Sequence, residues 1–213
     1  MPSAPANVSA QLEWGVATLT LPGERESGDL HLVKAVARGV LVAVVDGLGH
    51  GSEAAAAAHA AVAALDLHAG ESVLPLLERC HRALQGTRGA VMSLALFDPA
   101  GRSMTWAGVG NVEGRLLYAD GPGRVPRLRG SLVTRGGIVG SELPRVQSQT
   151  LPVGAGDTLI FATDGIKEGF ADGLPADVTP QQLADQILAC CGKSTDDALV
   201  LVARCRGGTS PKG

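Results

Sequence analysis

The stretch LVAVVDGLGHGS, residues 41–52, decides the fold, because it joins an apolar run to a helical run through an acid and three glycines. Residues 30–45 alternate between apolar and polar positions and then become continuously apolar. This pattern predicts a β-hairpin whose second strand is buried on both faces. The alanine-rich run 52–69 predicts a helix with Ser52 as its N-cap. Asp46 is therefore expected at the rim of a sheet, where the buried strand ends.

The rest of the chain mixes strand and helix patterns. Residues 90–118 have an apolar period of two with turn residues between the runs, which predicts antiparallel strands. Thr179, Pro180 and Gln182 occupy the N-cap, first-turn and N3 positions of a helix start. The other expected elements are a helix over 72–85, a surface loop over 121–130, a glycine turn at 136–140, a buried strand over 157–163 and a final strand over 197–205.

Length and composition favour one folded domain. The chain has 213 residues, of which 45% are hydrophobic and 18% charged, so it lacks the composition of a disordered protein. We expect a single domain over residues 12–205, with short tails at 1–11 and 206–213.

Charge and hydropathy exclude several classes of protein. A net charge of −3 offers no basic face for nucleic acid. No apolar run is long enough to span a membrane, and the start of the chain lacks the pattern of a signal peptide. The four cysteines form no C-x-x-C pair, which favours reduced, mostly buried thiols over a zinc site. We therefore expect a cytoplasmic protein without nucleic-acid or membrane partners. The sequence leaves the oligomeric state open, with a monomer favoured.

Aspartates stand at the ends of several predicted strands. Asp29 precedes the first strand of the hairpin, Asp46-Gly47 and Asp164-Gly165 follow buried strands, and Asp196-Asp197 lead into the last strand. Such aspartates can simply form turns. Carboxylates gathered at one rim would however repel one another unless hard divalent cations such as Mg²⁺ or Mn²⁺ neutralised them. Two cations held in this way can acidify a water and bind a phosphate.

These acids lie within longer motifs. In chain order they are GD at 28–29, DGLGHG at 46–51, TDGIKE at 163–168 and DD at 196–197. Together they resemble the metal-dependent serine/threonine phosphatases of the SpoIIE branch of the PPM family, and within it the stand-alone RsbX-like phosphatases. The likeness also covers residues 77–97, 108–116 and 136–140, so it extends over about residues 12–204.

The resemblance implies an α+β fold, an α/β/β/α sandwich of two antiparallel sheets flanked by helices. It implies two Mn²⁺ or Mg²⁺ ions at one end of the sheets, and hydrolysis by metal-activated water without a covalent phosphoenzyme. Asp46 and Asp164 would carry the catalysis through this water. The expected metal ligands are Asp29, Asp46, the carbonyl of Gly47, Asp164 and Asp196.

Other residues near these motifs have open roles. Asp197 is expected to support the ligands. His50 could donate a proton, contact the substrate or help to begin the following helix, and Glu168 could support the site or be a solvated turn residue. The sequence departs from the family at Leu199, where a Thr or Ser is common, so a secondary hydrogen bond is in doubt. Arg25 is the only arginine shortly before the first motif, and we do not expect it to hold phosphate.

The resemblance further suggests a substrate. We expect a phosphatase acting on phosphorylated STAS-domain proteins, similar to RsbS or RsbR, in a sigma-factor or stressosome-like pathway. Two alternatives are a catalytically silent member that binds phosphoproteins, and a hydrolase of small phosphate esters. The complete set of acids argues against the silent form, and loops such as 119–135 would set the choice of substrate.

Overall fold

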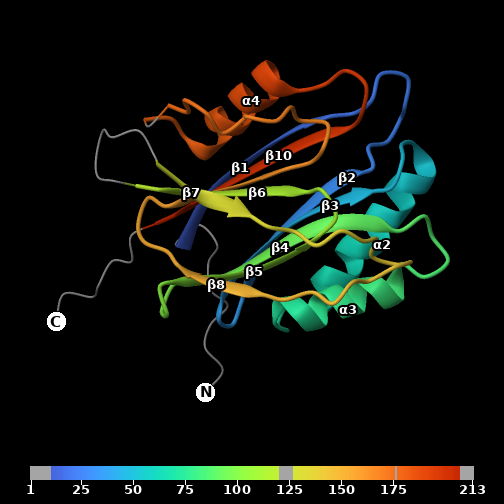
Figure 1. Ribbon diagram of the computed structural model, residues 1–213, viewed down its shortest axis with the longest axis horizontal. Helices are drawn as coiled ribbons and strands as arrows, with labels where there is room; N and C mark the ends of the chain where they lie inside the picture. Colours follow the sequence, from blue (N-terminus) through green and yellow to red (C-terminus); the bar gives the residue numbers. More distant parts are fainter. Residues whose placement is uncertain (1–10, 120–126, 176, 207–213) are drawn as a thin grey trace.

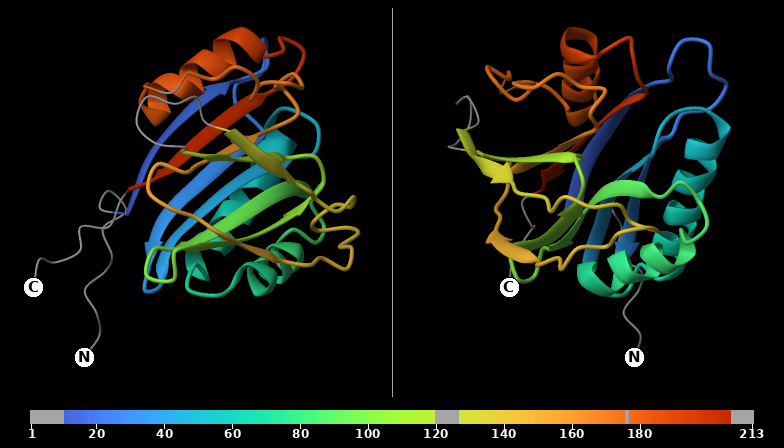
Figure 2. Two further views of the ribbon diagram at one scale, coloured as in Figure 1. Left: turned by 60° about the vertical axis from the view of Figure 1, so that its left-hand side comes forward. Right: turned by 45° about the vertical axis from the view of Figure 1, so that its right-hand side comes forward.

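The computed structural model describes residues 11–119, 127–175 and 177–206. Within them, two five-stranded sheets pack face to face and helices cover both outer faces, as Figures 1 and 2 show. All paired neighbouring strands are antiparallel. The predicted α/β/β/α sandwich is therefore confirmed.

The first sheet has the strand order β1-β10-β9-β6-β7, and the second has the order β2-β3-β4-β5-β8. Helices α2 (Ser52–Leu67) and α3 (Val73–Ala83) cover the second sheet, and α4 (Pro180–Cys191) covers the first. The strands are β1 (Leu12–Leu19), β2 (Asp29–Val36), β3 (Gly39–Gly47), β4 (Ala90–Asp98), β5 (Ser103–Val109), β6 (Glu113–Tyr118), β7 (Arg127–Leu132), β8 (Gln149–Pro152), β9 (Thr158–Ala162) and β10 (Ala198–Cys205).

The core has three layers, and β3 contributes to two of them. Val40, Val42 and Val44 lie between the two sheets, whereas the residues that alternate with them pack against α2 and α3. A strand can serve both layers because successive side chains point to opposite faces. The prediction that this strand is buried on both faces is confirmed by its burial from Gly39 to Val45.

The helix ends agree with those predicted from the sequence in α4, but the start of α2 differs from its prediction. Thr179 and Gln182 form the predicted capping box, and Gly192 is the C-cap of α4. The prediction of Ser52 as N-cap is wrong, because Gly51 holds that position and Ser52 is the first residue of α2. Gly51 has a φ of 76°, a backbone conformation that suits glycine and not serine.

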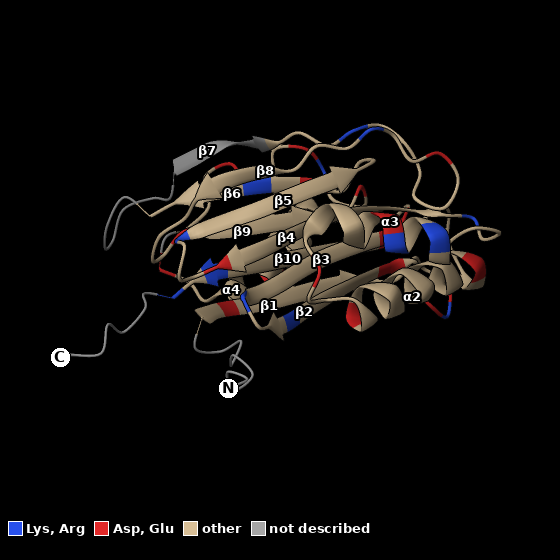
Figure 3. Ribbon diagram, turned by 90° about the horizontal axis from the view of Figure 1, so that it is seen from below, with Lys and Arg blue, Asp and Glu red and all other residues tan. Residues whose placement is uncertain are grey.

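Two further expectations need correction. The loop predicted over 121–130 gives way to strand β7 from Arg127, and residues 120–126 lie outside the described residues, as do nearly all of the two expected tails. The four cysteines are free, but only Cys80 is buried and Cys190 is exposed. Charged residues are sparse along the strands and occur mainly near strand ends, in loops and on the helices (Figure 3). No helix in the described part of the chain is long and apolar enough to cross a membrane.

Candidate metal centre at one end of the sandwich

Strand alternation places four polar side chains between the two sheets at the same end. Asp46 continues the series Val40, Val42 and Val44 on the inner face of β3. By the same alternation, Thr163 follows Leu159 and Phe161 at the end of β9, and Asp197 precedes Leu199 and Leu201 of β10. Asp29 lies directly opposite Asp46 in the β2–β3 register. The fold thus brings acids from both sheets to one edge.

Asp29 and Asp46 are poorly solvated and repel each other. Burial raises the pKa of Asp46 to about 9, and the charges of Asp29, Asp164, Asp196 and Asp197 add to the effect. Burial also raises the pKa of Asp29 to about 7, with further contributions from Asp197, Asp164 and Asp196, while a hydrogen bond from Thr163 opposes the rise. These five carboxylates are therefore close enough to influence one another.

Asp164 and Asp196 lie at the more open side of this edge. The Asn111 side chain donates a hydrogen bond of 2.8 Å to Oδ2 of Asp164, and Lys193 Nζ donates one of 2.5 Å to the Asp164 carbonyl. Burial raises the pKa of Asp196, with smaller contributions from Asp164 and Asp197. Asn111 and Lys193 hold the Asp164 loop in position, and neither was among the residues predicted for the site.

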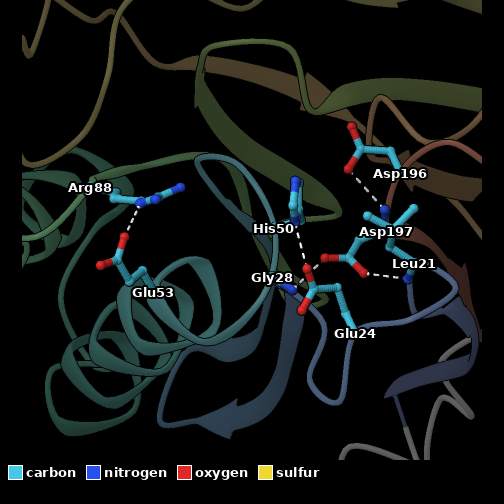
Figure 4. Close-up of polar contacts among 8 residues, drawn as sticks. All are labelled: Leu21, Glu24, Gly28, His50, Glu53, Arg88, Asp196 and Asp197. Carbon is cyan, nitrogen blue, oxygen red and sulfur yellow. Dashed lines mark hydrogen bonds and ion pairs between the residues drawn. The ribbon is translucent and has the colours of Figure 1, made fainter.

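Asp197 fastens the segment that leads to Asp29. Its Oδ1 accepts a hydrogen bond from the Leu21 amide at 2.8 Å, and its Oδ2 accepts one from the Gly28 amide at 2.7 Å (Figure 4). Its exposed fraction is 3%, so these bonds are shielded from water. Asp197 therefore holds this segment in position, and its support of metal ligands stays a prediction.

The hydroxyl of Thr163, directly after β9, links Asp29 to the backbone of β10. Thr163 Oγ1 donates to Asp29 Oδ2 at 2.7 Å and accepts from the Leu199 amide at 2.9 Å. Sequence reasoning missed this contact, because Thr163 and Asp29 are 134 residues apart in the chain and belong to different sheets.

His50 and Glu168 lie near the edge without joining the carboxylates directly. His50 Nδ1 pairs with Glu24 Oε1 at 2.7 Å, and its side chain is 59% exposed. His50 slightly opposes the rise in the pKa of Asp196 that burial causes, so the two groups interact across the edge. Glu168 is exposed and lines a groove of about 430 Å³ with Asn111, next to Asp164. A second cavity, of about 450 Å³, lies at the opposite end of the sandwich around Phe97 and Arg102.

The glycines of both Asp-Gly pairs are required for close packing. A Cβ on Gly47 would collide with the carbonyl of Ala54 in α2, and a Cβ on Gly165 would collide with the carbonyl of Asp197. The small alanines of α2 and Gly47 thus allow the helix to pack tightly beside the acidic edge. This steric requirement is independent of any role for the Gly47 carbonyl as a ligand.

The chemistry of the edge fits hard cations. Its donors are carboxylate oxygens, which Mg²⁺ and Mn²⁺ prefer. Burial and neighbouring acids raise the pKa values of Asp29 and Asp46, and no protein cation that the structure describes offsets the rise. Among the described residues, no three histidine, cysteine or acidic side chains converge into a ready-made cage. Mg²⁺ usually keeps several waters and uses only one or two carboxylates per ion, so it does not need such a cage.

Comparisons with known proteins agree with this geometry. The family model of Stage II sporulation protein E (SpoIIE) matches residues 37–206. The phosphoserine phosphatase RsbX of Bacillus subtilis (strain 168) is 29% identical over 151 residues, which are 71% of this chain and 73% of RsbX. A crystal structure of RsbX in complex with magnesium has a TM-score of 0.79 at 23% identity, covering 92% of this chain and 96% of that chain.

Two other structures have the same fold. One comes from work on the bacterial stressosome as a modular system adapted to control secondary messenger signalling. It has a TM-score of 0.80 at 34% identity and covers 91% of this chain and 99% of that chain. The catalytic domain of the serine/threonine phosphatase PstP with two manganese ions has a TM-score of 0.66 at 18% identity, covering 92% and 99%. The resemblance inferred from the motifs is confirmed, and the chain belongs to the SpoIIE family of PPM-type serine/threonine phosphatases.

Proposed function

We propose that this protein is a divalent-cation-dependent phosphatase that hydrolyses phosphoserine or phosphothreonine in a protein substrate. The observation that carries the proposal is the Asp29–Asp46 pair, two poorly solvated carboxylates held opposite each other in a SpoIIE-family chain. Magnesium in RsbX and manganese in PstP support the choice of cation.

The proposal gives each acid a role. Asp46 would contact both cations, and Asp29, Asp164, Asp196 and the carbonyl of Gly47 would complete the ligands. When bound, the cations supply positive charge for the phosphoryl group and lower the pKa of the attacking water.

The surrounding residues would keep the ligands in place. Thr163 holds Asp29, Asn111 holds Asp164, and Asp197 holds the segment before Asp29. Because these contacts exist within the fold itself, the carboxylates need little rearrangement when cations bind.

We further propose a phosphorylated STAS-domain protein, similar to RsbS or RsbR, as the substrate, acting in the cytoplasm within a stressosome-like pathway. The similarity to RsbX and to the chain from the stressosome study supports this choice. The groove lined by Asn111, Thr134 and Glu168 next to Asp164 could accept the polypeptide that flanks the phosphorylated residue.

One set of assays separates the proposed reaction from the proposed substrate. Wild type and Asp46→Asn are compared on p-nitrophenyl phosphate and on a phosphorylated STAS protein, each with Mn²⁺ or with EDTA. We expect Mn²⁺-dependent release of phosphate by wild type and a loss of at least about 100-fold in Asp46→Asn. Turnover in EDTA, or full activity of the variant, would refute the cation-dependent mechanism. Activity on the small ester alone would leave the chemistry and reject the STAS substrate.

A further inference from the structure

Arg88 lies beside the loop that follows Asp46, at a position that the backbone defines. The β3–β4 ladder reaches this end with Gly47 opposite Ala90, and the Leu48 amide donates to the carbonyl of Gly89 at 3.1 Å. Gly89 has a φ of 80°, and a Cβ there would lie 2.6 Å from Ile138 Cγ2. The segment before β4 is therefore packed firmly against the metal-motif loop, and it presents Arg88 at the same edge as the acids.

The guanidinium of Arg88 covers Gly49 and remains accessible. A Cβ on Gly49 would lie 2.6 Å from Arg88 Nη1, so the side chain passes directly over the loop. Arg88 Nε donates to Glu53 Oε2 at 2.5 Å, and the two side chains are 49% and 68% exposed (Figure 4). Among the described residues, Glu53 is the only ion-pair partner of Arg88. A guanidinium has five N–H donors, so most of its donors remain available to a ligand.

The other cations near this edge are less suited to receive an anion. Lys193 already donates to the carbonyl of Asp164, and His50 is paired with Glu24. Arg25 is exposed, but it lines a shallow depression together with Glu24 and Glu26, whose charges disfavour an anion. Arg115 lines the groove beside Asp164, but it is paired with Glu113. Arg88 therefore offers an accessible guanidinium beside the Asp46 loop.

We propose that Arg88 is a substrate-binding residue that holds an oxyanion of the substrate, and that Glu53 competes with the substrate for it. The inference rests on the proposed phosphatase function. An arginine fork suits both phosphate and carboxylate oxygens, so the anion is either the phosphoryl group itself or a carboxylate flanking the phosphoserine. Exposed Arg–Glu pairs are weak in water, so an incoming anion can displace Glu53, although the Glu53 carboxylate still competes with it.

Steady-state kinetics with Mn²⁺ test the inference through opposite effects of two variants. Arg88→Gln should raise KM about tenfold or more with a smaller change in kcat, whereas Glu53→Gln should lower KM. Arg79→Gln is the control, because Arg79 forms a half-buried ion pair with Glu71 at 2.9 Å on the α3 side of the molecule. It should behave like wild type.

The choice of substrates distinguishes the two sources of the anion. If Arg88 holds the phosphoryl group, Arg88→Gln raises KM for p-nitrophenyl phosphate and weakens competitive inhibition by inorganic phosphate. If it holds a flanking carboxylate, only phosphoserine peptides with acidic neighbours show the change. Both results support a role in binding the substrate.

Other results would overturn the inference. An active Arg88→Gln with unchanged KM for every substrate refutes it and leaves the proposed function intact, and so does an equal rise in KM in Arg79→Gln. Should Arg88→Gln fold poorly, Glu53→Gln alone decides, because an unchanged or higher KM in that variant contradicts the competition. A wild type that hydrolyses none of the substrates with Mn²⁺ refutes the proposed function and this inference together.

Discussion

Asp29 and Asp46 lie directly opposite each other on neighbouring antiparallel strands, and both have a raised pKa. A pair of carboxylates in this position costs stability whenever both are ionised, because each lacks water and faces the charge of the other. A bound divalent cation offsets this cost, because it favours the charged forms of the carboxylates that the metal-free fold disfavours.

The first prediction concerns pH and the metal-free protein. The pKa of Asp46 is about 9 in the folded state against 3.8 without the fold, so the folded state retains a proton that the unfolded state releases. Stability in EDTA should therefore fall as pH rises between about 4 and 9. Asp46→Asn cannot ionise, so its melting temperature should exceed that of wild type by a margin that grows from about pH 5 to pH 8. A margin that is constant or shrinks with pH would contradict the raised pKa.

The second prediction concerns the hydroxyl of Thr163. Thr163→Val removes the hydrogen bond that lowers the pKa of Asp29, so protons should compete better with Mn²⁺. We expect binding of Mn²⁺ to require higher pH and stability to fall by about 1–2 kcal/mol. Thr158→Val is the control, because Thr158 is equally buried at the other end of β9 and its hydroxyl bonds to Gly156. Equal shifts of Mn²⁺ binding in both variants would show that Asp29 is not the cause.

The third prediction concerns the carboxylate of Asp197. Asp197→Ala leaves the part-buried amide of Leu21 and the buried amide of Gly28 without their acceptor, and hydrogen bonds to a charged group contribute about 1.5–3 kcal/mol each. We expect a loss of about 3 kcal/mol or more in chemical denaturation. Asp98→Ala, which removes a single bond to the exposed turn at Gly101, should lose less than about 1 kcal/mol. Similar losses in the two variants would contradict a clamping role for Asp197.

The fourth prediction concerns packing at the Asp-Gly motif. Gly47→Ala places a methyl group against the carbonyl of Ala54, so α2 must shift away from β3. We expect destabilisation of about 3 kcal/mol or more, measured by thermal melting followed by circular dichroism. Gly70→Ala is the control, because a Cβ there meets no atom within 4 Å. A Gly47→Ala protein as stable as wild type would show that the helix can move at little cost.

Much of this architecture could be predicted because its signals are local. The hairpin around Gly39 and the capping box at Thr179 depend on residues close in sequence, and both form as predicted. The acids at the strand ends were identified from the apolar runs beside them. Alternation along each strand then indicates which of them point between the sheets.

The rest depends on contacts between distant segments. The edge strands β1 and β8 were not among the predicted elements; β8 is short and largely exposed, so it has no clear apolar alternation. Thr163 belongs to the site because the end of β9 lies across from the start of β2 in the opposite sheet, which the sequence does not show. Arg88 was missed because its sequence neighbours carry no acid, and only the β3–β4 register places it beside the Asp46 loop.

Calorimetric titration of Mn²⁺ into wild type and Asp46→Asn tests most directly whether Asp29, Asp46, Asp164 and Asp196 form the cation-binding centre. The titration is run near pH 7 in two buffers that differ in ionisation enthalpy, so that proton release is measured together with affinity. We predict that wild type binds Mn²⁺ and releases protons, because the pKa values of Asp29 and Asp46 are raised. Asp46→Asn should bind at least about 100-fold more weakly and release fewer protons. Equal affinity and equal proton release in the two proteins would contradict the assignment of this edge as the metal centre.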